Sequence, residues 1–231
     1  MSQQERENMH NAIRSTRAGR TWSPWLGLLV LGFAATVAQA QDSGESNACG
    51  PLSGIHYGPY DYRTEKGRLR IVDTAHFTPV VEALVSGATG DLNKDIDYTL
   101  HAAPNHHRAL VSLMRLAARS KAVQLRGFQW PFACYFDRAV RFAPDDVIVR
   151  MLYAQFLGQN KRVEDAVRQL NFAIKLAPEN AITQYNVGLV FMELGQHDRA
   201  LEQAHLALKM GYTRAELTDS LKKVNRWKEP E

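Results

Sequence analysis

The C-terminal half of the chain repeats itself at a fixed spacing. Small and turn-forming residues recur along it, namely Ala139, Ala173 and Ala207, and then Pro144, Pro178 and Tyr212. Their common period of 34 is the length of one helix–turn–helix unit of a solenoid. Because one such unit cannot bury its own apolar faces, successive units have to stack. The period therefore predicts an all-α fold, an α-solenoid whose extended groove binds another polypeptide.

Two units follow the period without an insertion, residues 147–180 and 181–214. Each has small residues where paired helices have to approach closely and a large apolar residue that fills the gap to the next unit. These are Ala154, Leu157, Ala166, Ala173 and Pro178 in the first unit, and Gly188, Phe191, Ala200, Ala207 and Tyr212 in the second. This pattern resembles the tetratricopeptide repeat family, which implies that the α-solenoid is right-handed. Arg150 and Gln184 depart from it, since the family has an aromatic residue there, and Tyr212 replaces a proline.

The resemblance weakens toward the N-terminus. Residues 105–146 are predicted to form a divergent repeat, with Asn105 as N-cap of a first helix over 105–120. An enlarged turn over 124–131 and a second helix over 132–142 complete it. Residues 70–104 are predicted to form a further divergent helical repeat, which is interrupted at 86–90.

Beyond the repeats, residues 213–228 are predicted to form a capping helix. A solenoid needs such a solvent-facing terminal unit. Thr213 is its predicted N-cap, and Glu216, three positions on, completes a capping box. Leu217, Leu221 and Val224 are predicted to face inward.

Residues 1–40 have the three parts of a secretory signal peptide. Arg14, Arg17 and Arg20 precede an apolar stretch, which ends in small residues at Ala38 and Ala40. Cleavage after Ala40 would deliver a periplasmic protein. The alternative is that residues 22–40 are retained and anchor the chain in the inner membrane, because about 20 uncharged residues can span a bilayer. Contact with a membrane is expected only in that case.

Charge argues against nucleic acid as a partner. Residues 1–40 hold four of the 28 basic and two of the 24 acidic residues, so cleavage leaves a formal charge of +2. A nearly balanced surface has no electrostatic attraction for a polyanion.

Residues 41–69 are rich in glycine, proline and tyrosine, which predicts an irregular arm instead of a helix. The arm holds Cys49, and the other cysteine of the chain is Cys134. In an oxidising compartment an even count favours a disulfide, which would tie the arm to a repeat helix. The alternative is two unpaired, buried thiols.

The resemblance also implies which side chains line the concave face. By family analogy they come from the first helix of each unit: Ile148, Met151, Gln155 and Gly158, then Ile182, Tyr185, Leu189 and Met192. The lining is expected to be apolar and uncharged. Asn186 alone matches the family's clamp for a C-terminal carboxylate. Two occupants fit such a groove, a hydrophobic partner segment or the protein's own aromatic arm.

Catalytic motifs are absent from the sequence, and we expect neither enzymatic activity nor a cofactor. His101, His106 and His107 cluster within a short stretch, and one metal set would combine His101, one of the other two histidines and Asp97. Two hypotheses follow. The first is an exported scaffold that binds another envelope protein, and the second is a periplasmic carrier of a ligand or metal that uses the arm and the three histidines.

Overall fold

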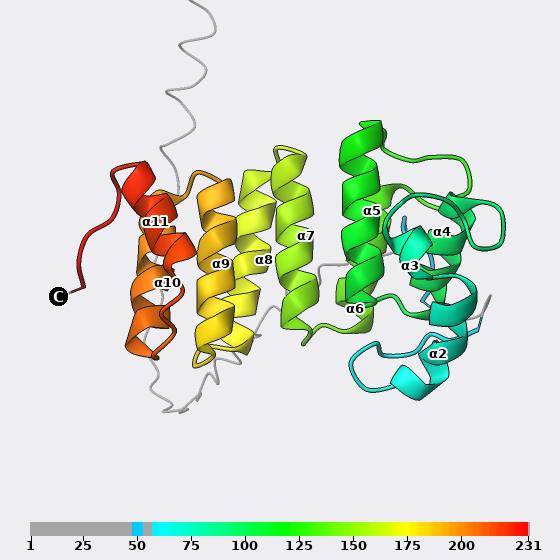
Figure 1. Cartoon of the computed structure of the whole chain (residues 1–231), viewed down its shortest axis with the longest axis horizontal. Helices are drawn as coiled ribbons and strands as arrows, with labels where there is room; N and C mark the ends of the chain where they lie inside the picture. The colour runs from blue at the N-terminus through cyan, green and yellow to red at the C-terminus, as the bar shows by residue number, and fades with distance from the viewer. Residues whose placement is uncertain (1–47, 53–56, 231) are drawn as a thin grey trace, which may run out of the picture. The chain divides into compact units, whose positions relative to one another are not determined.

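The computed structural model describes residues 48–52 and 57–230; the predicted signal segment and its cleavage site lie outside the described residues. In the described part the secondary structure consists of ten α-helices with no strand, which confirms the all-α class (Figure 1). The helices are α2 (Lys66–Ala75), α3 (Pro79–Glu82), α4 (Leu92–Ala102), α5 (His107–Ser120), α6 (Phe132–Phe142), α7 (Val147–Gln159), α8 (Val163–Leu176), α9 (Ala181–Glu193), α10 (His197–Lys209) and α11 (Ala215–Lys223). None of them is long and apolar enough to cross a membrane.

The two regular units form two helix pairs. α7 packs on α8 and α9 packs on α10, while α9 also contacts α7 and α8 (Figure 1). The small residues of the repeat lie at these contacts, since Ala166, Ala173 and Ala200 are fully buried. A Cβ atom at Gly188 would lie 2.5 Å from Leu217 Cδ2. The recurring small residues therefore set how closely the helices approach.

The divergent unit 105–146 and the two regular units each have a side chain that caps their first helix. Asp146 accepts hydrogen bonds from the N–H groups of Ile148 and Val149, and one repeat later Asn180 accepts one from Thr183. In the divergent unit the cap is His106, whose Nδ1 accepts from Ala109 N at 3.1 Å. The prediction of Asn105 as cap was wrong by one position. Asn105 is fully buried and uses its side chain elsewhere.

The region predicted as one divergent repeat over 70–104 is less regular than expected. α2 begins at Lys66, before the predicted start, and the part of this repeat before the interruption at 86–90 holds two helices, α2 and α3. Pro79, which has no N–H to continue a helix, opens α3 after the cap Thr78. Val72 and Val81 are buried, but Val80 is 47% exposed. α4 agrees with the pattern, because its Ile96 and Leu100 are buried.

α11 covers α9 and α10, as expected of a capping helix, but its ends differ from the prediction. It begins after Arg214, with no side-chain cap, and it ends at Lys223. No capping box forms, and the Glu216 carboxylate accepts a hydrogen bond from Tyr185. Leu217 and Leu221 are buried as predicted, whereas Val224 lies beyond the helix and is 41% exposed.

Candidate functional site

A groove lies between the first helices of the two regular units, α7 and α9. It encloses about 210 Å³. Five of the nine residues assigned to the predicted groove line it, namely Ile148, Met151, Gln155, Asn186 and Leu189, together with Leu152, Val190 and Glu193. The cavity therefore lies between side chains of α7 and α9 that are in corresponding parts of the two helices.

Four predicted groove residues, Gly158 among them, do not line this cavity. Ile182 is 55% exposed on the first turn of α9, and Met192 packs partly buried against the core of α7–α11. Tyr185 is buried, with its ring 4.8 Å from that of Tyr212 and its hydroxyl donating to Glu216. Burial, together with the nearby Glu216 carboxylate, raises the Tyr185 pKa. Tyr185 therefore contacts Tyr212, which replaces the expected proline, and Glu216 of α11.

The groove carries one charge that sequence reasoning missed. Glu193 lines it, and both carboxylate oxygens accept from Gln155 Nε2 at 3.3 Å. Burial raises the Glu193 pKa, and the Gln155 amide partly opposes this effect. The expectation of an uncharged groove was therefore wrong. Glu193 follows Leu189 by one helical turn, and this spacing could have placed it on the same face.

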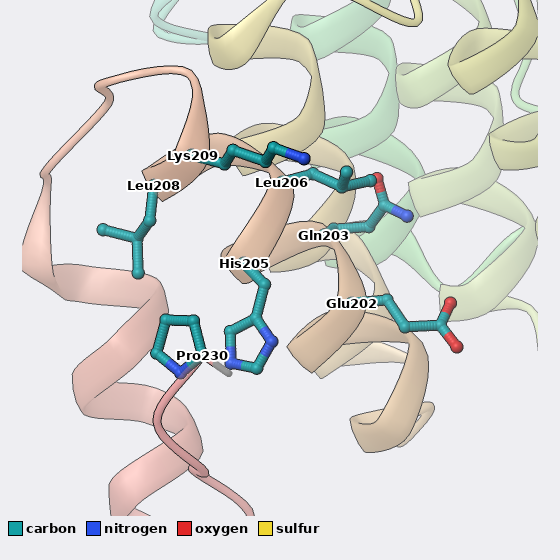
Figure 2. Close-up of a pocket in the computed structure, with 7 residues that line it drawn as sticks. All are labelled: Glu202, Gln203, His205, Leu206, Leu208, Lys209 and Pro230. Atoms are coloured by element: carbon teal, nitrogen blue, oxygen red, sulfur yellow. The ribbon is translucent and has the colours of Figure 1, made fainter.

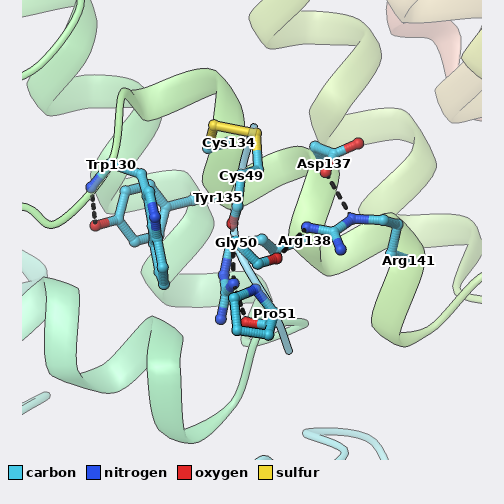
Figure 3. The surroundings of a disulfide bond; sticks show 9 residues. All are labelled: Cys49, Gly50, Pro51, Trp130, Cys134, Tyr135, Asp137, Arg138 and Arg141. Atoms are coloured by element: carbon cyan, nitrogen blue, oxygen red, sulfur yellow. Dashed lines mark hydrogen bonds and ion pairs between the residues drawn. A yellow bond between two sulfur atoms is a disulfide. The ribbon is translucent and has the colours of Figure 1, made fainter. Parts of the chain in front are cut away.

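The disulfide between Cys49 and Cys134 is present, which confirms the predicted pairing over a sequence separation of 85 (Figure 3). Backbone carbonyls of the arm also accept hydrogen bonds from α6. Arg138 donates to the carbonyls of Cys49 and Pro51, and Arg141 donates to that of Gly50. The first described stretch of the arm therefore lies along α6.

The second stretch of the arm crosses the ends of α4 and α5. Tyr60 N donates to Ala102 O, and Tyr62 N donates to Asn105 Oδ1. Arg63 forms two hydrogen bonds of 3.0 Å with Asp145, at the turn before α7. Neither described stretch of the arm contributes to the lining of the groove between α7 and α9.

The three clustered histidines have separate structural partners. Nδ1 of His101 is 2.7 Å from the Asp97 carbonyl oxygen, and its Nε2 is 2.8 Å from Gln129 Oε1. His106 Nε2 lies 2.9 Å from Asp73, and His107 Nε2 lies 2.8 Å from Asp146. Over residues 48–52 and 57–230 no group of three or more His, Cys, Asp or Glu is placed to hold a metal ion.

A larger cavity of about 820 Å³ lies beside α10 (Figure 2). Its walls include Leu206 and His205 of α10, and Pro230 of the C-terminal tail closes one side. The His205 Nε2 atom is 2.8 Å from the carbonyl oxygen of Lys228, so α10 also contacts the tail at this point. Sequence reasoning missed this cavity because residues 224–230 carry no periodic pattern.

Comparison of the sequence with models of known protein families and with curated proteins found no match. The function has to be inferred from the geometry of the chain itself.

Proposed function

We propose that the protein is an exported, non-catalytic scaffold of the tetratricopeptide type. It binds a segment of another envelope protein in the groove between α7 and α9. The observation that carries this proposal is the groove itself, which is lined mainly by apolar side chains and lies where two stacked units meet.

The surface around the groove favours an apolar partner. Ile148 and Ile182 hold the same place in successive units and are 45% and 55% exposed. Exposed β-branched side chains that recur along neighbouring helices offer anchor points to a segment that crosses both of them. Gln155 and Asn186 supply amide groups that can hydrogen-bond to a peptide backbone.

The disulfide supports an oxidising compartment. Disulfides persist in the periplasm and outside the cell, whereas cytosolic thiols are kept reduced. This agrees with the signal peptide predicted for residues 1–40, which delivers a periplasmic protein if it is cleaved. If residues 22–40 are retained, the same scaffold is held at the inner membrane.

The proposal is tested by cross-linked capture from envelope fractions with the full-length protein. Ile148→Asp combined with Ile182→Asp places two charges on the groove rim at exposed positions, where folding tolerates them. We expect the wild type to recover a defined partner that this double variant loses.

Val85→Asp is the matched control, because Val85 is 74% exposed and lies in the loop before α4. Capture by this variant should equal that of the wild type. Retention of the partner by the Ile148, Ile182 double variant would show that the groove is not the binding surface.

A further inference from the structure

A cavity of about 540 Å³ lies between α6, α7 and α8, on another side of α7 from the groove. α7 contributes Arg150, Tyr153 and Leu157 to this cavity, whereas its Ile148, Met151 and Gln155 face the groove. These two sets follow helical spacing on separate faces of one helix. The cavity and the groove are therefore distinct surfaces.

Positive charge exceeds negative charge around this cavity. Its lining holds four arginines, Arg141, Arg150, Arg162 and Arg168, against two aspartates, Asp137 and Asp165. Asp137 pairs with Arg141 at 2.7 Å. Asp165 is shared, since it pairs with both Arg162 and Arg168. The lining thus carries two positive charges that its own carboxylates do not neutralise.

Arg150 is the arginine of this lining that no carboxylate of the described chain neutralises. Its guanidinium donates to Pro144 O at 3.0 Å and to Gln169 Oε1 at 2.9 Å, and it lies 4.8 Å from the Phe172 ring centroid. These acceptors are neutral and leave N–H groups of the guanidinium unused. Burial lowers the pKa of Arg150, because desolvation disfavours a charge without a counter-ion.

The next unit shows that hydrogen bonding to the carbonyls at the end of the preceding helix needs no charged side chain at this position. Gln184 occupies the place of Arg150 one repeat later, and its Nε2 donates to the carbonyls of Ala177 and Pro178. Pro178 corresponds to Pro144, which accepts from Arg150. A neutral amide therefore satisfies the carbonyls at the end of the preceding helix. The charge of Arg150 exceeds what this task requires.

We propose that this cavity binds a small organic anion. The carboxylate or phosphate of the ligand accepts hydrogen bonds from the unused N–H groups of Arg150, because a guanidinium matches the geometry of both oxyanions. The positive charges of Arg162 and Arg168 attract the same anionic group. The apolar part of the ligand contacts Phe172, which is 47% exposed at the edge of the cavity. This site acts independently of the proposed binding of a polypeptide in the groove.

The test is isothermal titration calorimetry on the full-length, oxidised protein at low ionic strength. The probes are benzoate, phenyl phosphate and inorganic phosphate. Saturable binding is expected and should weaken as salt is added, and the comparison of benzoate with phenyl phosphate decides between carboxylate and phosphate. Arg150→Gln should weaken binding about tenfold or more, because it removes a charge-assisted hydrogen bond.

Two further variants make the result decisive. Arg70→Gln removes one charge from the exposed surface of α2 and should bind like the wild type. Arg168→Gln changes a side chain that is 66% exposed, so it keeps the fold and should weaken binding severalfold. Absence of saturable binding to any probe, or equal binding by wild type, Arg150→Gln and Arg168→Gln, would overturn the proposal.

Discussion

At the scale of single residues, the Asp146 side chain contacts several separate segments of the chain, which no sequence pattern indicated. Its Oδ1 caps α7, and its Oδ2 accepts from Asn105 at 3.1 Å and from His107 at 2.8 Å. Arg63 of the arm lies 3.6 Å from the same oxygen. A carboxylate that is 2% exposed thus connects the arm, α5 and α7.

We expect Asp146→Asn to lower the free energy of unfolding by about 1–3 kcal/mol, since hydrogen bonds to a charged acceptor are lost. The amide oxygen of the new asparagine can still cap α7, so the loss of stability measures the contacts of Asp146 with Asn105, His107 and Arg63. Urea denaturation measures it. Asp145→Asn is the control, because its side chain is 66% exposed and surface pairs contribute at most about 1 kcal/mol. Equal losses in the two variants would contradict this role of Asp146.

A second prediction at this scale concerns how the stability of the fold depends on pH. Burial raises the pKa of Asp95, but hydrogen bonds from Thr89, His76 and the Ala88 N–H outweigh it, so the pKa is lowered. The balance for Asp146 is the same, with burial outweighed by His107 and by backbone and Asn105 N–H donors. Both groups bind protons more weakly in the folded state than in the unfolded state.

Stability from these aspartates is therefore fully present above the ordinary aspartate pKa of about 3.9 and is lost as pH falls through it toward the lowered folded values. The melting temperature should fall steadily below about pH 5. Asp95→Asn should be less stable at neutral pH and lose less on acidification. If the melting temperature of Asp95→Asn fell with pH as steeply as that of the wild type, Asp95 would not be a source of the acid sensitivity.

At the scale of elements, the repeat determines where helices begin and how closely they pack. α6 spans the predicted range of 132–142, and the helices of the two regular units fall within their predicted boundaries. The failures are at places where the period stops. Pro79 begins a separate short helix within the predicted repeat 70–104, and α11 has no side-chain cap while the Glu216 carboxylate accepts from Tyr185. Local patterns predict an element well when no distant group competes for its residues.

Gly188→Leu should destabilise the last unit by about 1–3 kcal/mol or more, as overpacked cores do. Beyond Leu217, the added side chain would meet Gln203 Cβ, 3.3 Å from a Cβ at this position. Thermal denaturation measures the effect, and hydrogen exchange should show it first in α9–α11. Gly67→Leu is the control, because nothing lies within 4 Å of its added Cβ. An unchanged melting temperature for Gly188→Leu would refute the packing described here.

At the scale of the whole molecule, the disulfide and the buried Arg138 hold the arm on α6. The Arg138 guanidinium lies 3.9 Å from the Trp130 ring centroid, and a Cβ at Gly50 would approach the same ring to 3.0 Å. These contacts join segments that are far apart in the chain. Removal of the disulfide is therefore expected to affect stability and the environment of Trp130 together.

Reduction should lower the free energy of unfolding by up to about 4 kcal/mol, because the closed loop restricts the unfolded chain. Urea titrations with and without reductant measure the loss, and tryptophan fluorescence should change under native conditions. The Cys49→Ser, Cys134→Ser double variant should match the reduced protein and show no response to reductant. A wild type that is equally stable in both conditions would contradict the prediction.

The sequence by itself determined the all-α class and favoured the bond between Cys49 and Cys134, and five of the nine residues that it assigned to a groove line one cavity of the described structure. These depend on periodicity, on small residues at helix contacts and on residue counts, all of which are local or repeated. Only the tertiary structure decided that the first described stretch of the arm lies on α6 and that Tyr185 is buried. It also decided that Glu193 places a charge in the groove and that Arg150 has no carboxylate partner in the described chain. Each of these outcomes depends on contacts between distant segments, and a periodic pattern shows which residues share a face but does not show what covers that face.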